Sequence, residues 1–103
     1  MNKVYKYSLH ECKNVTMSGK VRTNLQVIKY GYCYNPYDGL ELCKDEFLSF
    51  KKKFNPRCII VSRSIERPVR EGFYEHIVVG RNHGDYNLPG LIFQCEEIKI
   101  ETP

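Results

Sequence analysis

The chain has 103 residues, of which 42% are hydrophobic, 27% charged and 13% aromatic. This length predicts a single domain over residues 1–103, and the composition excludes a disordered chain. The net charge of +4 is low for a dedicated nucleic-acid binder, and no stretch approaches the ~20 apolar residues of a membrane helix.

The first part of the chain is expected to form two long strands. Residues 3–12 alternate between apolar and polar side chains, as in a half-buried strand. Residues 21–34 alternate as well, but the phase of the apolar side chains slips at residues 27–28, close to Gly31. We therefore expect a β-bulge or a bend at residues 27–28.

The only clear helical pattern follows a predicted turn at residues 35–39. Apolar side chains recur there at spacings of three and four, at Leu40, Cys43, Phe47, Phe50 and Phe54. Acidic residues begin this stretch and Lys51–Lys53 end it, which favours both ends of a helix. We place the helix at residues 44–54, because residues 40–42 could instead pair with residues 30–34 as a hairpin.

The second part of the chain is again rich in strands, which we expect at residues 57–67, 73–79 and 91–101. Residues 81–90 are expected to form a long loop. Because strands mostly follow strands, the sequence predicts an α+β fold. Its sheet would be five- to six-stranded and mostly antiparallel, or a small bent barrel, with one amphipathic helix at about residues 44–54.

The five cysteines are odd in number and scattered, and no secretory signal pattern opens the chain. We expect free thiols and a cytoplasmic location, which includes the cytoplasm of a host cell. The spacing of His10 and Cys12 is the nearest approach to a metal-binding pair, but short ligand pairs such as C-x-x-C are missing. No metal and no cofactor are expected.

Alanine and tryptophan are missing, whereas lysine, asparagine, isoleucine and tyrosine are plentiful. This bias is typical of an AT-rich coding genome, as in phages, other viruses and some bacteria. In such genomes a short basic protein is often an accessory protein that binds and inhibits a host factor. The bias concerns origin and carries no chemistry of its own.

Arginine and tyrosine supply the candidate binding surface. Guanidinium groups suit phosphate, carboxylate and aromatic faces, and tyrosine is enriched at binding hot spots. The candidate residues are Tyr32, Tyr34, Arg63, Arg67, Arg70, Arg81, His83 and Tyr86. The opposing interpretation is that Glu66, Glu71 and Glu75 neutralise the arginines and that strands favour aromatic residues in any case.

The leading hypothesis is a non-enzymatic binding protein that engages a host macromolecule, most simply a protein, or an anionic ligand through this arginine and tyrosine surface. One alternative is a module for single-stranded nucleic acid that uses the same residues. Another is a small hydrolase or transferase centred on His83 and Asp85, although no recognisable catalytic motif is found. The protein is expected to be a monomer or a homodimer, since an exposed edge strand can pair with its own copy.

Overall fold

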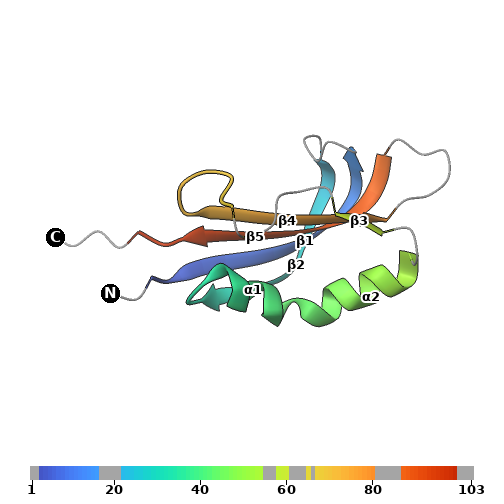
Figure 1. Ribbon diagram of the computed structural model, residues 1–103. Helices are drawn as coiled ribbons and strands as arrows, with labels where there is room; N and C mark the ends of the chain where they lie inside the picture. The colour runs from blue at the N-terminus through green and yellow to red at the C-terminus, as the bar shows by residue number, and fades with distance from the viewer. Residues whose placement is uncertain are drawn as a thin grey trace.

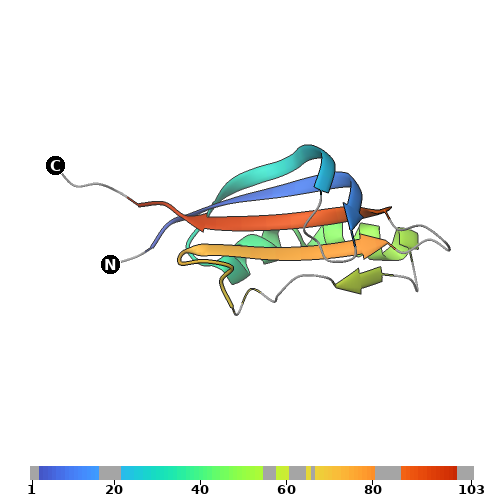
Figure 2. The ribbon, with the colours of Figure 1, turned by 90° about the horizontal axis from the view of Figure 1, so that it is seen from above.

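The computed structural model describes residues 3–16, 22–54, 58–60, 65, 67–80 and 87–99. Along the chain the elements are β1 (Tyr5–Thr16), β2 (Arg22–Cys33), α1 (Pro36–Leu42), α2 (Lys44–Phe54), β3 (Cys58–Ile60), β4 (Phe73–Gly80) and β5 (Asn87–Glu97). The strands form one sheet in the order β2-β1-β5-β4-β3, and all neighbours in it are antiparallel. Both helices lie under one face of the sheet (Figure 1). No helix of the described ranges lies on the opposite face, and Figure 2 looks onto it. We call it the open face.

The predicted bulge at residues 27–28 is confirmed by the pairing of β1 with β2. Leu9 lies opposite Lys29, whereas the next residue, His10, lies opposite Val27. Ile28 is therefore the extra residue of β2. A second irregularity interrupts the pairing of β1 with β5 between Cys12 and Val15. Beyond these two points the ends of β1, β2 and β5 turn away from the helices (Figure 1), as bulges increase local twist and bending.

The main hydrophobic core lies between the sheet and the helices. Leu9 and Phe93 are fully buried at its centre, and Cys43 and Phe47 reach it from below. Full burial of one such large side chain contributes about 1.5–3 kcal/mol. A second cluster lies on the open face inside the bend, formed by Cys12, Val15, Ile77, Val79, Leu88 and Ile92. The bend thus allows both faces of one sheet to bury apolar residues.

The prediction of a single helix is wrong, because residues 36–42 form a second helix, α1, in place of a turn and a hairpin strand. Asn35 caps this helix: its side-chain oxygen accepts a hydrogen bond from the Asp38 backbone amide at 2.9 Å. Pro36 follows at the start of the helix, where its fixed φ is favourable. Asn35 and Pro36 were predicted to begin a turn, but they form the N-terminal cap and the start of α1. The predicted helix at residues 44–54 is confirmed as α2.

The α+β class and the antiparallel sheet are confirmed. The small barrel is not, because the sheet is open and has β2 and β3 at its two edges. Four strands are long, whereas β3 has only three residues, so the sheet has four full strands in the described part of the chain and the predicted five to six are not confirmed. The last strand begins at Asn87, inside the predicted loop. Among the described residues no helix is long and apolar enough to cross a membrane.

Candidate binding surface

A row of four side chains crosses the open face near the ends of the chain. Lys6 of β1 lies between Tyr32 of β2 and Glu96 of β5, and Glu96 lies opposite Phe73 of β4. With strands about 4.8 Å apart, this row spans about 14 Å. It places an exposed tyrosine at one side of the sheet and Phe73 at the other.

A second row runs beside the first one, from Tyr30 through Ser8 and Gln94 to Glu75. Gln94 Nε2 donates a hydrogen bond of 3.0 Å to Glu75 Oε2, and the Glu75 residue is only 8% exposed. Ser8 Oγ lies 2.9 Å from His10 Nε2, two residues further along the same face of β1. The centre of the open face is therefore a hydrogen-bonded polar strip.

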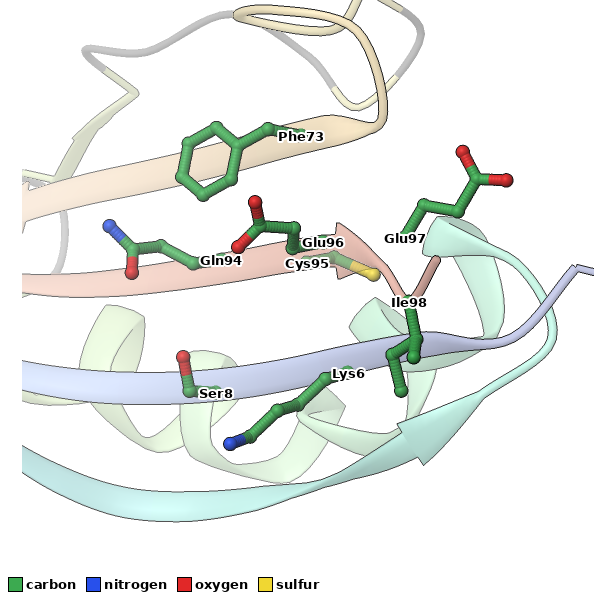
Figure 3. A pocket seen from close by; sticks show the side chains of 8 residues that line it. All are labelled: Lys6, Ser8, Phe73, Gln94, Cys95, Glu96, Glu97 and Ile98. Atoms are coloured by element: carbon green, nitrogen blue, oxygen red, sulfur yellow. The ribbon is translucent and has the colours of Figure 1, made fainter. Parts of the chain in front are cut away.

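A shallow hollow of about 290 Å³ lies across these two rows (Figure 3). Lys6 and Ser8 border it from β1, Gln94 and Glu96 from β5, and Phe73 from β4. It combines an aromatic side with charged and amide groups. It is too shallow to enclose a small molecule, and sites for such ligands usually bury most of the ligand surface.

Half of the exposed large apolar residues in the described part of the chain lie on β2. Leu25 and Val27 are each 51% exposed, Tyr30 is 73% exposed and Tyr32 is 65% exposed. They all lie on the open face, because Leu25 is opposite Cys12 and Val27 is opposite His10, while Tyr30 and Tyr32 are opposite Ser8 and Lys6. We call Leu25, Val27, Tyr30 and Tyr32 the β2 ridge. The extra residue Ile28 puts the two halves of the ridge on one face, since simple alternation would separate them.

The structure brings only part of the predicted arginine and tyrosine surface together. Arg70 lies on the same face as Tyr32, at the other end of the first row, where its Nη2 atom is 3.2 Å from Glu96 Oε1. Its guanidinium carbon also lies 4.4 Å from the centre of the Phe73 ring. The neutralisation that the opposing interpretation expected thus affects Arg70, through Glu96. Because both side chains are more than half exposed, this ion pair is weak.

The other predicted binding residues are distributed as follows. Arg67 and Tyr34 are exposed, and Tyr34 directly follows the end of β2. Arg63, Arg81, His83 and Tyr86 lie outside the described residues, as does Asp85 of the alternative catalytic centre. Leu25, Val27 and Tyr30 of the ridge were not among the predicted binding residues. The slip in the phase of the apolar side chains at residues 27–28 was the feature of the sequence that indicated a common face with Tyr32.

The charges on the open face are nearly balanced. Lys6 and Arg70 contribute positive charge, and Glu75 and Glu96 contribute negative charge from the same two rows. A surface that binds nucleic-acid phosphates needs an excess of cations. The open face in the described part of the chain does not provide that excess.

The Ser8–His10 pair resembles a nucleophile and its base in distance alone. Acyl transfer also needs backbone N–H groups that are free to stabilise an oxyanion. β1 is an interior strand that pairs with β2 on one side and with β5 on the other, so its backbone amides at this point belong to ladders. β1 itself therefore offers no free backbone amide for an oxyanion beside this pair.

The described thiols are buried in the core. Cys33, Cys43 and Cys95 are free thiols, and Cys12 is buried as well. Burial raises the pKa of Cys43 to about 11, and burial likewise raises the pKa of Cys33 and of Cys95. A thiol held in its protonated form is a poor nucleophile. Across the described ranges, no three histidine, cysteine or acidic side chains gather as a candidate metal site.

Lys29 fixes the helix side of β2 to α2. Its Nζ atom lies 3.0 Å from Glu46 Oε1 and also donates to the Leu42 carbonyl oxygen. The hydrogen bond to Glu46 raises the pKa of Lys29. Burial alone would raise the pKa of Glu46, but the hydrogen bond from Lys29 brings it below its ordinary value. The one charged side chain in the described central part of β2, residues 25–33, is therefore engaged within the protein.

Comparison with known proteins gives no relative: no family model matches the chain, and no curated protein or solved structure shows significant similarity to it.

Proposed function

We propose that this chain is a non-enzymatic binding protein whose partner is another protein, and that the β2 ridge is the contact surface. The observation that carries the proposal is the line of four half- to three-quarter-exposed apolar side chains on one face of an edge strand. Monomeric proteins rarely leave contiguous apolar surface of this kind uncovered without a binding role.

The composition of the ridge supports a protein partner. Tyrosine gives a large contact area at low cost in side-chain entropy, and it is enriched at the centre of protein interfaces. At roughly 200 Å² for each aromatic side chain, Tyr30 and Tyr32 alone would bury roughly 280 Å² at their observed exposure. Leu25 and Val27 extend this apolar line, and the polar strip beside it would form the rim.

The balanced charge of the open face favours a protein over single-stranded nucleic acid. Exposed tyrosines on a sheet can stack with bases, but that mode of binding also needs a cationic path for the backbone. Glu75 and Glu96 stand where that path would run. If the AT-rich composition does reflect a phage or viral origin, the partner would be a protein of the host.

Site-specific photo-cross-linking in the producing cells tests the proposal. A photoreactive phenylalanine derivative replaces Tyr32 in one variant and Tyr37 in a matched control, since Tyr37 is 56% exposed but lies on α1, on the other side of the sheet. We expect a cross-linked partner protein from position 32 that is missing from position 37. Tyr30→Ala combined with Leu25→Ala should abolish it.

Equal cross-linking from both positions would contradict the proposal. A parallel assay measures the binding of short single-stranded DNA and RNA at low and high salt. Strong binding at low salt that falls steeply with salt would support the nucleic-acid alternative. We expect no such binding.

A further inference from the structure

β2 is an edge strand that lacks several of the usual protections against pairing. Among the described residues its only neighbour in the sheet is β1, and it is 12 residues long. Natural edge strands are commonly short or carry proline or exposed charges, which prevent association with other strands. β2 contains no proline, and in its described central part, residues 25–33, the single charge of Lys29 is bound to Glu46. None of the described strands pairs with the outer side of β2, which can therefore accept another strand.

The order of side chains along the β2 ridge is complementary to its own reverse. From one end to the other the ridge carries two aliphatic residues, Leu25 and Val27, and then two tyrosines, Tyr30 and Tyr32. An antiparallel copy of β2 reverses this order. Each aliphatic residue can then lie opposite a tyrosine of the copy, and aliphatic–aromatic pairs are favourable across antiparallel strands.

We propose that β2 pairs antiparallel with β2 of a second copy of this chain, with Leu25 opposite Tyr32 of the copy and Val27 opposite Tyr30. A two-fold axis between Ile28 and Lys29 generates both sets of pairs. On the helix side the same register places Lys29 opposite Ile28 of the copy, so that the two lysines do not face each other. The bulge makes this register possible, because directly opposed residues must share a face and Leu25 and Tyr32 would not do so in a regular strand.

The dimer is independent of the proposed partner protein. Pairing at the edge uses the backbone of β2 and the flanks of the ridge, while the tops of the ridge side chains continue to face outward. The two ridges then lie side by side at the centre of one continuous sheet. An antiparallel second copy always presents this reversed order of side chains, because it has the same sequence. An unrelated strand need not do so.

Measurement of molar mass in solution is the first test. By light scattering coupled to size exclusion, we expect twice the 12.1 kDa of one chain, falling towards one chain on dilution. Val27→Lys places an unpaired charge on the edge and should give a monomer. Tyr37→Lys places the same charge on exposed α1 and should leave the dimer intact. A monomeric wild-type protein at high concentration, or a dimeric Val27→Lys variant, would overturn the proposal.

Cysteine cross-linking tests the register and does not depend on how Val27→Lys folds. Val27→Cys and Tyr30→Cys variants, distinguished by a tag, are mixed and oxidised. The proposed register sets Val27 and Tyr30 of two copies opposite each other, whereas two copies of the same position are offset by three residues, about 10 Å. Disulfides need Cα atoms within about 7 Å. We expect mixed disulfides to exceed homodisulfides clearly. Homodisulfides in equal yield, or no mixed product, would refute the register.

Discussion

Gly31 lies directly opposite Tyr7 across β2 and β1, so close that a β-carbon on Gly31 would stand 2.9 Å from the Tyr7 hydroxyl oxygen and 3.0 Å from its ring. The ring of Tyr7 in turn stacks on Phe93, with centroids 6.2 Å apart and planes 25° from parallel. Phe93 is fully buried, so the ring of Tyr7 has little room to retreat. The absence of a side chain at residue 31 therefore keeps β2 flat against the core, between the two tyrosines of the ridge.

Gly31→Ala should lower the free energy of unfolding by about 1–3 kcal/mol, the usual cost of forcing an extra carbon into a packed site. Urea unfolding followed by circular dichroism measures the change. Tyr7→Phe removes the oxygen of the closest contact, so the double variant should lose less stability than the sum of the two single variants. Strict additivity would show that Gly31 is not constrained by Tyr7.

His76 predicts a dependence of stability on pH. Its ring lies edge-on to Phe47 with centroids 5.4 Å apart, and its Nδ1 atom is buried without a hydrogen-bond partner among the described residues. Burial lowers the pKa of His76 from its ordinary value of 6.5, and the charge of Lys51 lowers it further. The folded state therefore disfavours the protonated ring. The free energy of unfolding keeps its full value with respect to His76 above about pH 6.5, and it decreases as the pH falls through the pKa of His76 in the folded state.

His76→Phe retains an aromatic side chain against Phe47 but removes the titrating group. Urea unfolding at about pH 7.5 and about pH 5 compares the two proteins, since the pKa of histidine falls between these values when it is unperturbed. The wild-type protein should lose more stability between the two pH values than His76→Phe does. Equal losses would assign the acid sensitivity to carboxylates such as Glu46, whose pKa is also lowered.

The buried thiols predict resistance to alkylation. The Sγ atoms of Cys33 and Cys95 lie 3.8 Å apart inside the core, and burial raises the pKa of both thiols. We expect iodoacetamide at neutral pH to leave Cys33, Cys43 and Cys95 unmodified in the folded protein and to modify them in urea. Peptide mass spectrometry reports each site, and a Tyr37→Cys variant supplies an exposed thiol as a positive control. Rapid labelling of Cys95 in the folded state would contradict the packing.

Local patterns in the sequence were sufficient for elements that depend on short-range order. The spacing of Cys43, Phe47, Phe50 and Phe54 predicts α2, and the phase slip at residues 27–28 predicts the bulge at Ile28. In both cases the side chains report directly on which face of the element meets the core. No knowledge of distant neighbours is needed.

Which residues share a surface depends on how distant strands pair. The hydrophobic periodicity of the sequence carries no information about that pairing. β5 lies between β1 and β4, so that Glu96 lies opposite Lys6 and its carboxylate pairs with Arg70. Glu66, Glu71 and Glu75, which are near Arg70 in the sequence, were the expected partners, yet Glu96 of another strand pairs with Arg70. For the ridge, the phase slip indicated a bulge at residues 27–28, and the register with β1 shows that Leu25 and Tyr32 lie on one face.

α1 was missed for a different reason, because residues 35–39 contain the same residue types in a turn as in a helix cap. The geometry decides between them: Asn35 is extended, its side-chain oxygen accepts from the Asp38 amide, and its Nδ2 atom donates to Asp38 Oδ2 at 2.9 Å. Gly39 then lets the helix approach the sheet, since a β-carbon there would stand 2.9 Å from Cys33 Sγ and 3.0 Å from the Phe93 ring. The cap and the close approach together hold a helix of only seven residues.

Asn35→Ala removes that cap and should cost about 0.5–2 kcal/mol of stability. A helix of seven residues cannot persist without tertiary packing, so the loss should appear both in global unfolding and as faster amide hydrogen exchange at Asp38 and Gly39. Asn35→Ser retains an oxygen that can accept from the Asp38 amide, and it should recover most of the loss. If Asn35→Ala and Asn35→Ser unfold at the same urea concentration, the packing of Gly39 against Phe93 alone sustains α1 and the cap is dispensable.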